Sequence, residues 1–223
     1  AYVQDMAGAG DLQPPTLNWT IGRHIEDMDK AGVEWSILSV TTPGIWFKDV
    51  ARGRRLARMT NDYAAQMRSL HPTRISQFAA IPLPDTEGSL REIEYGLDVL
   101  KADGIAVFTN YGDTWLGDPS FAPVMDELNR RKATLYTHPI TSDCCANIAS
   151  VVRDAVIEYG TDTTRAIGNW IMLVAVRLAR HQGELRRGQI EIKYIAALFA
   201  PRGQRNLIHG QGLAPAICSN TRG

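Results

Sequence analysis

His138 is the residue whose type and position best suit it to bind a metal or move a proton. It ends the run KATLYTH at residues 132–138 and is followed directly by Pro139. The residues before it are β-branched and aromatic, which is typical of a short buried strand, and a proline cannot continue a central strand. The sequence therefore places an imidazole at the carboxyl end of a strand, where it could serve as a ligand or a general base. The alternative is a core histidine whose two ring nitrogens are both satisfied by protein partners.

Other polar side chains also follow predicted strands directly. Thr41 follows the strand expected over residues 33–40, and Asn110 follows the strand expected over residues 104–109. In a parallel barrel these positions open onto one face with His138, so we expect Thr41 and Asn110 to contact a substrate. Trp115 lies in a polar loop expected over residues 110–120, where it could cover an aromatic substrate or pack against Phe121. No residue can be assigned to proton transfer from the sequence.

The elements that must position these residues alternate between helix and strand. Apolar residues at helical spacing predict helices after Thr20, over residues 50–70, after Asp85 and over residues 121–131. Strands are predicted between them, at residues 33–40, 75–81, 104–109 and 133–138. A later helix is expected to start at Asp162. Such alternation is typical of parallel βα units.

Two architectures fit this order: an open doubly wound sheet and a closed barrel. No Gly-x-Gly-x-x-Gly motif follows the first predicted strand, which disfavours dinucleotide binding. Polar residues at the end of strand after strand favour the (β/α)8 barrel of TIM type. We treat residues 1–223 as a single domain, and expect the barrel to be incomplete because a whole one usually takes about 250 residues.

Composition and charge exclude several classes of protein. Lys plus Arg equals Asp plus Glu, at 24 each, so we expect no nucleic-acid partner. No apolar run approaches the ~18 residues of a membrane span, and no signal peptide is evident. The three cysteines cannot make a disulfide framework, so a cytoplasmic setting is expected. Cys144 and Cys145 are adjacent and lack the spacing of metal ligands, so both are treated as structural. Whether the chain forms a homo-oligomer is left open.

Several segments of the chain form a recognisable series: LSVTTPG at 38–44, FAAIPLP at 78–84, NYGDTWLGDP at 110–119, FAPVMDELNRR at 121–131, YTHP at 136–139 and DTTRA at 162–166. Taken in this order, they resemble the amidohydrolase-related family, and within it the branch of aminocarboxymuconate-semialdehyde and 6-methylsalicylate decarboxylases. The resemblance extends over residues 18–180, and residues 181–223 are irregular.

The resemblance implies a TIM-type barrel that holds one divalent metal, with zinc expected and manganese as the alternative. His138 matches the family's ligand after strand five. His209, in NLIHGQG at residues 206–212, is a degenerate match to the ligand after strand six. The family's His-x-His motif and its final aspartate have no counterpart, since no two histidines lie two residues apart and no acidic residue follows Glu191. We therefore expect the N-terminal strand and the C-terminal strands of the barrel to be missing.

Three functions remain open at this point. The first is a metal-dependent decarboxylase (a carboxy-lyase) of a small aromatic or unsaturated carboxylic acid such as 6-methylsalicylate. The second is a hydrolase of a lactone or amide that uses a metal-bound water in the same barrel. The third is an inactive, truncated relative, because one metal ligand is clear and others are absent. Trp115 and the branch resemblance favour the decarboxylase.

Overall fold

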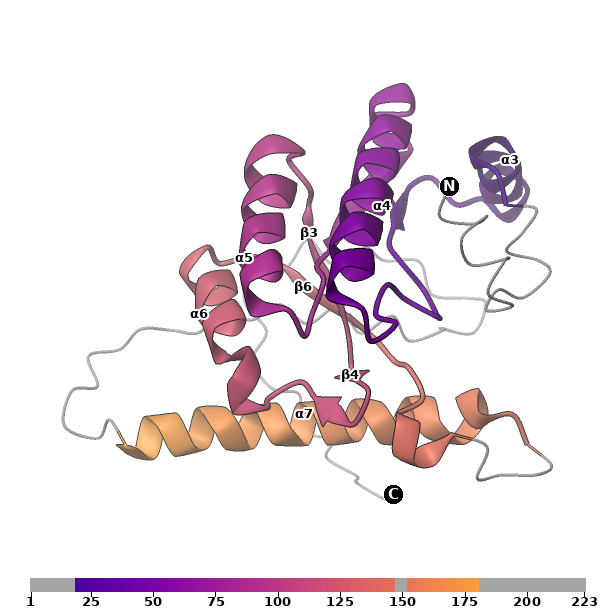
Figure 1. Cartoon of the computed structure of the whole chain (residues 1–223). Coiled ribbons are helices and arrows are strands. Elements are labelled where there is room, and N and C mark those ends of the chain that lie inside the picture. Colours follow the sequence, from indigo (N-terminus) through magenta and orange to yellow (C-terminus); the bar gives the residue numbers. More distant parts are fainter. Residues whose placement is uncertain (1–18, 147–151, 181–223) are drawn as a thin grey trace, which may run out of the picture.

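The computed structural model describes residues 19–146 and 152–180, and within them the sheet is parallel and four-stranded, in the order β1-β2-β3-β6 (Figure 1). The strands of this sheet are β1 (Ser36–Leu38), β2 (Ile75–Ala80), β3 (Gly104–Phe108) and β6 (Leu135–His138). A short antiparallel hairpin pairs β4 (Asn110–Tyr111) with β5 (Thr114–Trp115). The helices are α3 (Ile21–Ala31), α4 (Val50–Leu70), α5 (Thr86–Glu94), the π-helical η1 (Tyr95–Val99), the short η2 (Pro119–Phe121), α6 (Ala122–Arg130), the short η3 (Asp143–Cys145) and α7 (Asp154–Arg180).

The first two helices follow the capping and periodicity signals in the sequence. The hydroxyl oxygen of Thr20 accepts a hydrogen bond from the backbone N–H of Arg23 at 3.2 Å, which satisfies one of the free donors at the start of α3. Gly32 ends α3 with a left-handed backbone, at φ 66°. The predicted helix over residues 50–70 is α4, and the carboxylate of Asp49 caps it. Both predictions are confirmed.

The parallel pairing divides the side chains of the sheet between two faces. Ile105 is paired with Leu135, and Phe108 with His138, so alternate residues face opposite sides. Figure 1 shows α4, α5 and α6 side by side along one face. Phe78 and Tyr136 stack with their ring centres 5.7 Å apart, and Tyr136 shares its face of β6 with His138. His138 therefore lies on an aromatic face of the sheet.

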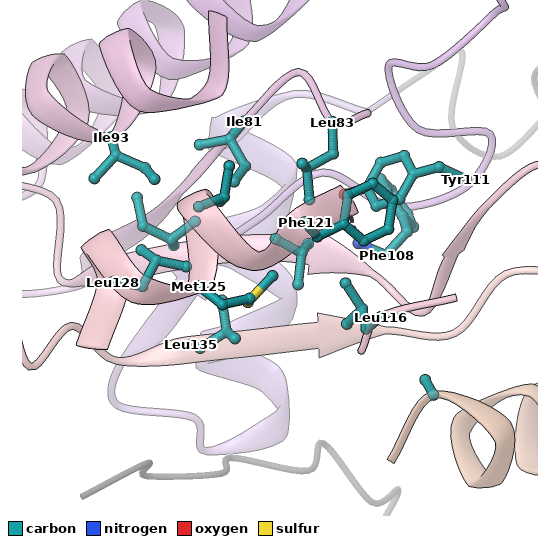
Figure 2. Packing of buried hydrophobic residues seen from close by; sticks show 14 of the residues in the cluster. Ile81, Leu83, Ile93, Phe108, Tyr111, Leu116, Phe121, Met125, Leu128 and Leu135 are labelled. Carbon is teal, nitrogen blue, oxygen red and sulfur yellow. Dashed lines mark hydrogen bonds between the residues drawn. The ribbon is translucent and has the colours of Figure 1, made fainter. Parts of the chain in front are cut away.

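The hydrophobic core lies between the sheet and its helices, and Figure 2 shows its packing. Strand residues meet helix residues there: Ile105 and Leu135 are buried together with Ile93 of α5 and Leu128 of α6. The core extends past the ends of the strands, since Tyr111 and Leu116 of the hairpin region belong to it. Burial of these side chains from both layers is what orients the strands, and thereby the residues at their ends.

The structure corrects three expectations about local structure. Residues 110–120 are not an open polar loop, because β4 and β5 pair there and Tyr111 and Leu116 are buried. The first strand is shorter than residues 33–40 and spans only Ser36–Leu38. Asp162 does not start a helix, since it lies in the interior of α7. In the hairpin, the burial of Tyr111 and Leu116 overrode the polar, turn-like local signal.

Helix α7 lies across the carboxyl end of the sheet, next to the β4–β5 hairpin (Figure 1). Its buried residues recur every four positions, at Glu158, Asp162, Ala166 and Trp170. Gly117, with φ 94°, lies so close to α7 that an added Cβ would come within 2.5 Å of the backbone nitrogen of Trp170. In the described ranges, no helix is both long enough and apolar enough to cross a membrane.

Candidate active site

His138 ends β6 at the carboxyl edge of the sheet, as the sequence predicted. Its Nδ1 atom lies 2.7 Å from the carbonyl oxygen of Pro139. Because a carbonyl oxygen can only accept, Nδ1 carries the proton and Nε2 presents its lone pair. Burial lowers the pKa of His138 below the ordinary histidine value, and the bond to Pro139 only partly opposes this effect. The ring is therefore neutral at neutral pH, with its Nε2 prepared to accept a proton or bind a metal ion.

Thr41 meets His138 directly. The hydroxyl oxygen of Thr41 lies 3.1 Å from Nε2 of His138, so the hydroxyl donates to the imidazole. Thr41 is exposed, whereas His138 is half-buried. The Thr41 hydroxyl thus occupies the position on Nε2 at which a metal ion or an acidic proton would bind.

Asn110 and Trp115 are brought together by Asp162. The Asp162 carboxylate is fully buried and accepts hydrogen bonds from Nδ2 of Asn110, at 2.7 Å, from the indole N–H of Trp115 and from the hydroxyl of Thr109. Asn110 also donates to the carbonyl oxygen of Ile140, at 2.9 Å. A buried carboxylate needs such donors, because its desolvation is otherwise costly. Asp162 therefore fixes the orientation of two residues that the sequence singled out.

A cavity of about 400 Å³ opens beside these residues. Its walls come from the segment after β1, from Phe108 and Asn110 at the end of β3, and from residues just beyond β6. Phe108 also contacts His138 edge to face, with ring centres 5.6 Å apart. The cavity and the imidazole thus share one wall.

The predicted site residues are placed as follows. Thr41, Asn110 and His138 all lie at the carboxyl end of the sheet, as expected. Trp115 lies in β5 and is half-buried, but it does not line the cavity. His209 lies outside the described residues. Over residues 19–146 and 152–180, no group of three or more His, Cys, Asp or Glu side chains could hold a metal ion. Within this part of the chain, His138 is therefore not part of a group of three or more such side chains, and its role as a ligand stays a prediction.

Sequence reasoning missed several residues of this region. Lys48 and Arg52 line the cavity, and Lys48 has a left-handed backbone, at φ 59°, which no local pattern indicates. The role of Asp162 was missed as well, because its burial depends on the packing of α7 and is seen only in the structure. The structure also joins Cys144 to Cys145 by a disulfide, which the interpretation of both as structural cysteines did not foresee.

Comparisons with known proteins agree with this geometry. Residues 19–183 match the amidohydrolase family. The chain is 38% identical over 169 residues to 6-methylsalicylic acid decarboxylase of Aspergillus aculeatus. This match covers 74% of the chain and 51% of the Aspergillus protein. Among solved structures, 5-carboxyvanillate decarboxylase from Sphingomonas paucimobilis superposes with a TM-score of 0.67 at 28% identity, over 75% of this chain and 51% of that one.

A second solved structure contains a metal. The 5-carboxyvanillate decarboxylase from Novosphingobium aromaticivorans, with bound manganese and 3-methoxy-4-hydroxy-5-nitrobenzoic acid, has a TM-score of 0.61 at 28% identity, over 71% of this chain and 46% of that one. The chain spans about half the length of the relatives it matches. The match to the family over residues 19–183, together with a parallel sheet that places its polar residues at the carboxyl end, shows that the chain belongs to the amidohydrolase family.

Proposed function

We propose that this protein acts as a metal-dependent carboxy-lyase that removes the carboxylate of a small aromatic acid such as 6-methylsalicylate. The observation that carries the proposal is His138, a neutral imidazole whose Nε2 lone pair lies at the carboxyl end of a parallel sheet beside an aromatic-lined cavity. Its relatives include decarboxylases of 6-methylsalicylic acid and of 5-carboxyvanillate, which supports the lyase over the hydrolase. The fold is proposed to be of the TIM-barrel type, and residues 1–223 are proposed to belong to a single domain.

One divalent metal is proposed as the cofactor. The donor type fits: a neutral imidazole held by a backbone carbonyl is an arrangement that zinc and manganese sites use. His138 would supply one ligand, and we propose His209, outside the described residues, as a second. When bound, the metal would stabilise the negative charge of the substrate's oxygens as carbon dioxide leaves. Zinc is the proposed ion, and manganese is the alternative that a solved relative favours.

The side chains around the cavity are proposed to bind and orient the substrate. Asn110 donates its amide hydrogens to Asp162 and to the carbonyl of Ile140, which leaves its amide oxygen to accept from a ligand. We propose that this oxygen accepts a hydrogen bond from a phenolic hydroxyl of the substrate. Thr41 is proposed to contact the substrate from its position on His138. Trp115 acts through Asp162, to which its indole N–H is bound, and a direct contact of its ring with the substrate remains a prediction. We further propose a cytoplasmic enzyme without nucleic-acid or membrane partners.

The proposal is tested by carbon dioxide release. The purified full chain is loaded with zinc or with manganese and incubated with 6-methylsalicylate, and carbon dioxide and the decarboxylated phenol are measured. We expect metal-dependent release that is lost in His138→Ala and kept in His71→Ala, since His71 caps the end of α4, away from the cavity. Release that does not depend on metal, or that survives loss of His138, would refute the proposal.

A further inference from the structure

The cavity beside His138 has flat aromatic walls. Four aromatic residues line it, Trp46, Phe47, Phe108 and Tyr111. Phe108 and Tyr111 pack edge to face with their ring centres 6.3 Å apart, and the backbone N–H of Phe108 donates to the Tyr111 hydroxyl at 3.1 Å. Both residues are buried, so this wall is held in place by the core. Walls of this kind favour a planar ring that can stack or pack edge-on.

The charged groups that line the cavity are two cations and one carboxylate. Lys48 and Arg52 are the cations, and Asp143 is the carboxylate. The Lys48 ammonium lies 2.8 Å from Oδ2 of Asp143. This hydrogen bond raises the pKa of Lys48, which therefore stays protonated at neutral pH. Two cations thus face this cavity, and each can pair with an anionic ligand.

The backbone of Lys48 is held in a costly conformation. Its φ of 59° is in the left-handed region, which non-glycine residues rarely adopt and which is found disproportionately at functional sites. Arg52, on the first turn of α4, lies with its guanidinium carbon 4.1 Å from the centre of the Phe47 ring. This stacking orients the guanidinium plane along an aromatic wall. The two cations thus come from one short segment whose conformation is fixed.

We infer that this cavity is a binding subsite for a planar aromatic carboxylate, whose ring lies between the aromatic walls and whose carboxylate pairs with Lys48 and Arg52. Asp143 competes with the ligand, because the carboxylate of the ligand would replace that of Asp143 on the Lys48 ammonium. The inference deepens the proposed function, on which it rests, by naming the residues that recognise the acid. It assigns anion recognition to side chains of the segment after β1, apart from any metal ligand.

Binding without metal tests the subsite directly. Salicylate is titrated into the full chain in the presence of EDTA, and binding is followed by calorimetry and by Trp fluorescence, since Trp46 lines the cavity. Phenol, which lacks the carboxylate, and cyclohexanecarboxylate, which lacks the flat ring, are titrated in parallel. We expect salicylate to bind more tightly than either analogue, and added salt to weaken it.

Two variants of the ion pair have opposite expected effects. Lys48→Met removes the cation and should weaken salicylate binding by roughly two- to fivefold, the size expected for an ion pair at a partly exposed rim. Asp143→Asn removes the competitor and should tighten salicylate binding by a similar factor. Phenol binding should not change in either variant. Lys30→Met and Glu26→Gln break a comparable exposed pair on α3, far from the cavity lining, and serve as matched controls that should change nothing.

The outcomes separate this inference from the proposed function. Opposite shifts for Lys48→Met and Asp143→Asn support the subsite even if no carbon dioxide is released with metal, in which case the proposed function alone fails. No salicylate binding in EDTA, equal binding of salicylate and phenol, or shifts of the same sign in both variants would overturn the inference. Thermal unfolding of each variant confirms that the fold is intact, and Arg52→Gln gives a second reading of the same anion site if Lys48→Met does not fold.

Discussion

The side chains of Thr41 and His138 are hydrogen-bonded at 3.1 Å, although they belong to opposite edges of a four-stranded sheet. Thr41 follows the outer strand β1, and His138 ends the other outer strand, β6. In a flat sheet the outer strands would lie ~14 Å apart, at about 4.8 Å per spacing. The ends of β1 and β6 therefore converge, so the sheet is strongly curled at its carboxyl edge. This curl is what a segment of a barrel requires, and it brings polar residues from distant strands into one group.

His138→Ala should abolish stoichiometric metal binding by the protein. The reason is that Nδ1 of His138 is committed to the carbonyl of Pro139, which leaves Nε2 as a ligand atom. Zinc and manganese contents are measured by mass spectrometry after dialysis. His24→Ala, whose ring is bonded to Ser36 on the far edge of the sheet, is the control. Equal metal content in His138→Ala and the unchanged protein would contradict the assignment.

Asp162→Asn should destabilise the fold by about 2–4 kcal/mol, because an amide cannot accept the three hydrogen bonds that the buried carboxylate accepts. It should also weaken substrate binding, since Asn110 loses its anchor. The free energy of unfolding is obtained from urea titration. Asp27→Asn, an exposed aspartate paired only loosely with Lys30 at 3.6 Å, should change it by less than about 0.5 kcal/mol. A loss no larger in Asp162→Asn than in this control would count against the buried cluster.

Gly117→Ala should cost about 1–3 kcal/mol, because Gly117 has φ 94° and its added Cβ would lie 2.5 Å from the backbone of α7. Gly168→Ala offers a matched control on α7 itself, where a Cβ meets nothing within 4 Å. That substitution should stabilise the protein by about 0.5–1 kcal/mol, as alanine favours a helix interior. In urea titrations, the free energy of unfolding should therefore fall in Gly117→Ala and rise in Gly168→Ala.

Gln77→Met should stabilise the protein by about 1–3 kcal/mol. Gln77 lies in β2, is fully buried, and its amide nitrogen and oxygen have no hydrogen-bond partner among the described residues. Methionine has a similar volume and no such groups to desolvate. Gln66→Met, at an exposed position of α4, should be neutral. An unfolding free energy that falls in Gln77→Met would show that the amide is satisfied after all.

The stabilising effect of the Arg54–Asp85 pair should disappear in acid. Arg54 donates to both carboxylate oxygens of Asp85, at 2.5 and 3.0 Å, and this holds the pKa of Asp85 below its ordinary value. Because the folded pKa is lower than the unfolded one of about 3.9, the contribution is present above pH ~4 and is lost as the pH falls through the folded value. The difference in unfolding free energy between the wild type and Arg54→Gln should therefore shrink from pH 6 to pH 3. A pH-independent difference would contradict this origin.

The parts of the fold that could be predicted are those governed by local periodicity. The bounds of α4 follow from apolar residues at helical spacing, and the position of His138 follows from a β-rich run stopped by Pro139. The hairpin after β3 could not be predicted, because its residues are polar and turn-like and become ordered through the burial of Tyr111 and Leu116. Asp162 resembles a helix cap in the sequence, and only the hairpin packed under α7 makes it a buried acceptor. Lys48 enters the cavity through a backbone conformation that no local pattern specifies.

The order of strands in the sheet also bears on how the chain acquires its site during synthesis. Within the four-stranded sheet, each strand pairs with the member of that sheet that precedes it in the chain, from β1 to β2 to β3 to β6, so the sheet can grow in the order in which the ribosome releases it. The site cannot form in that way, because Thr41 and His138 are 97 residues apart and Asn110 and Asp162 are 52 apart. A nascent chain would therefore build most of its core early and assemble its polar groups only once β6 and α7 have emerged.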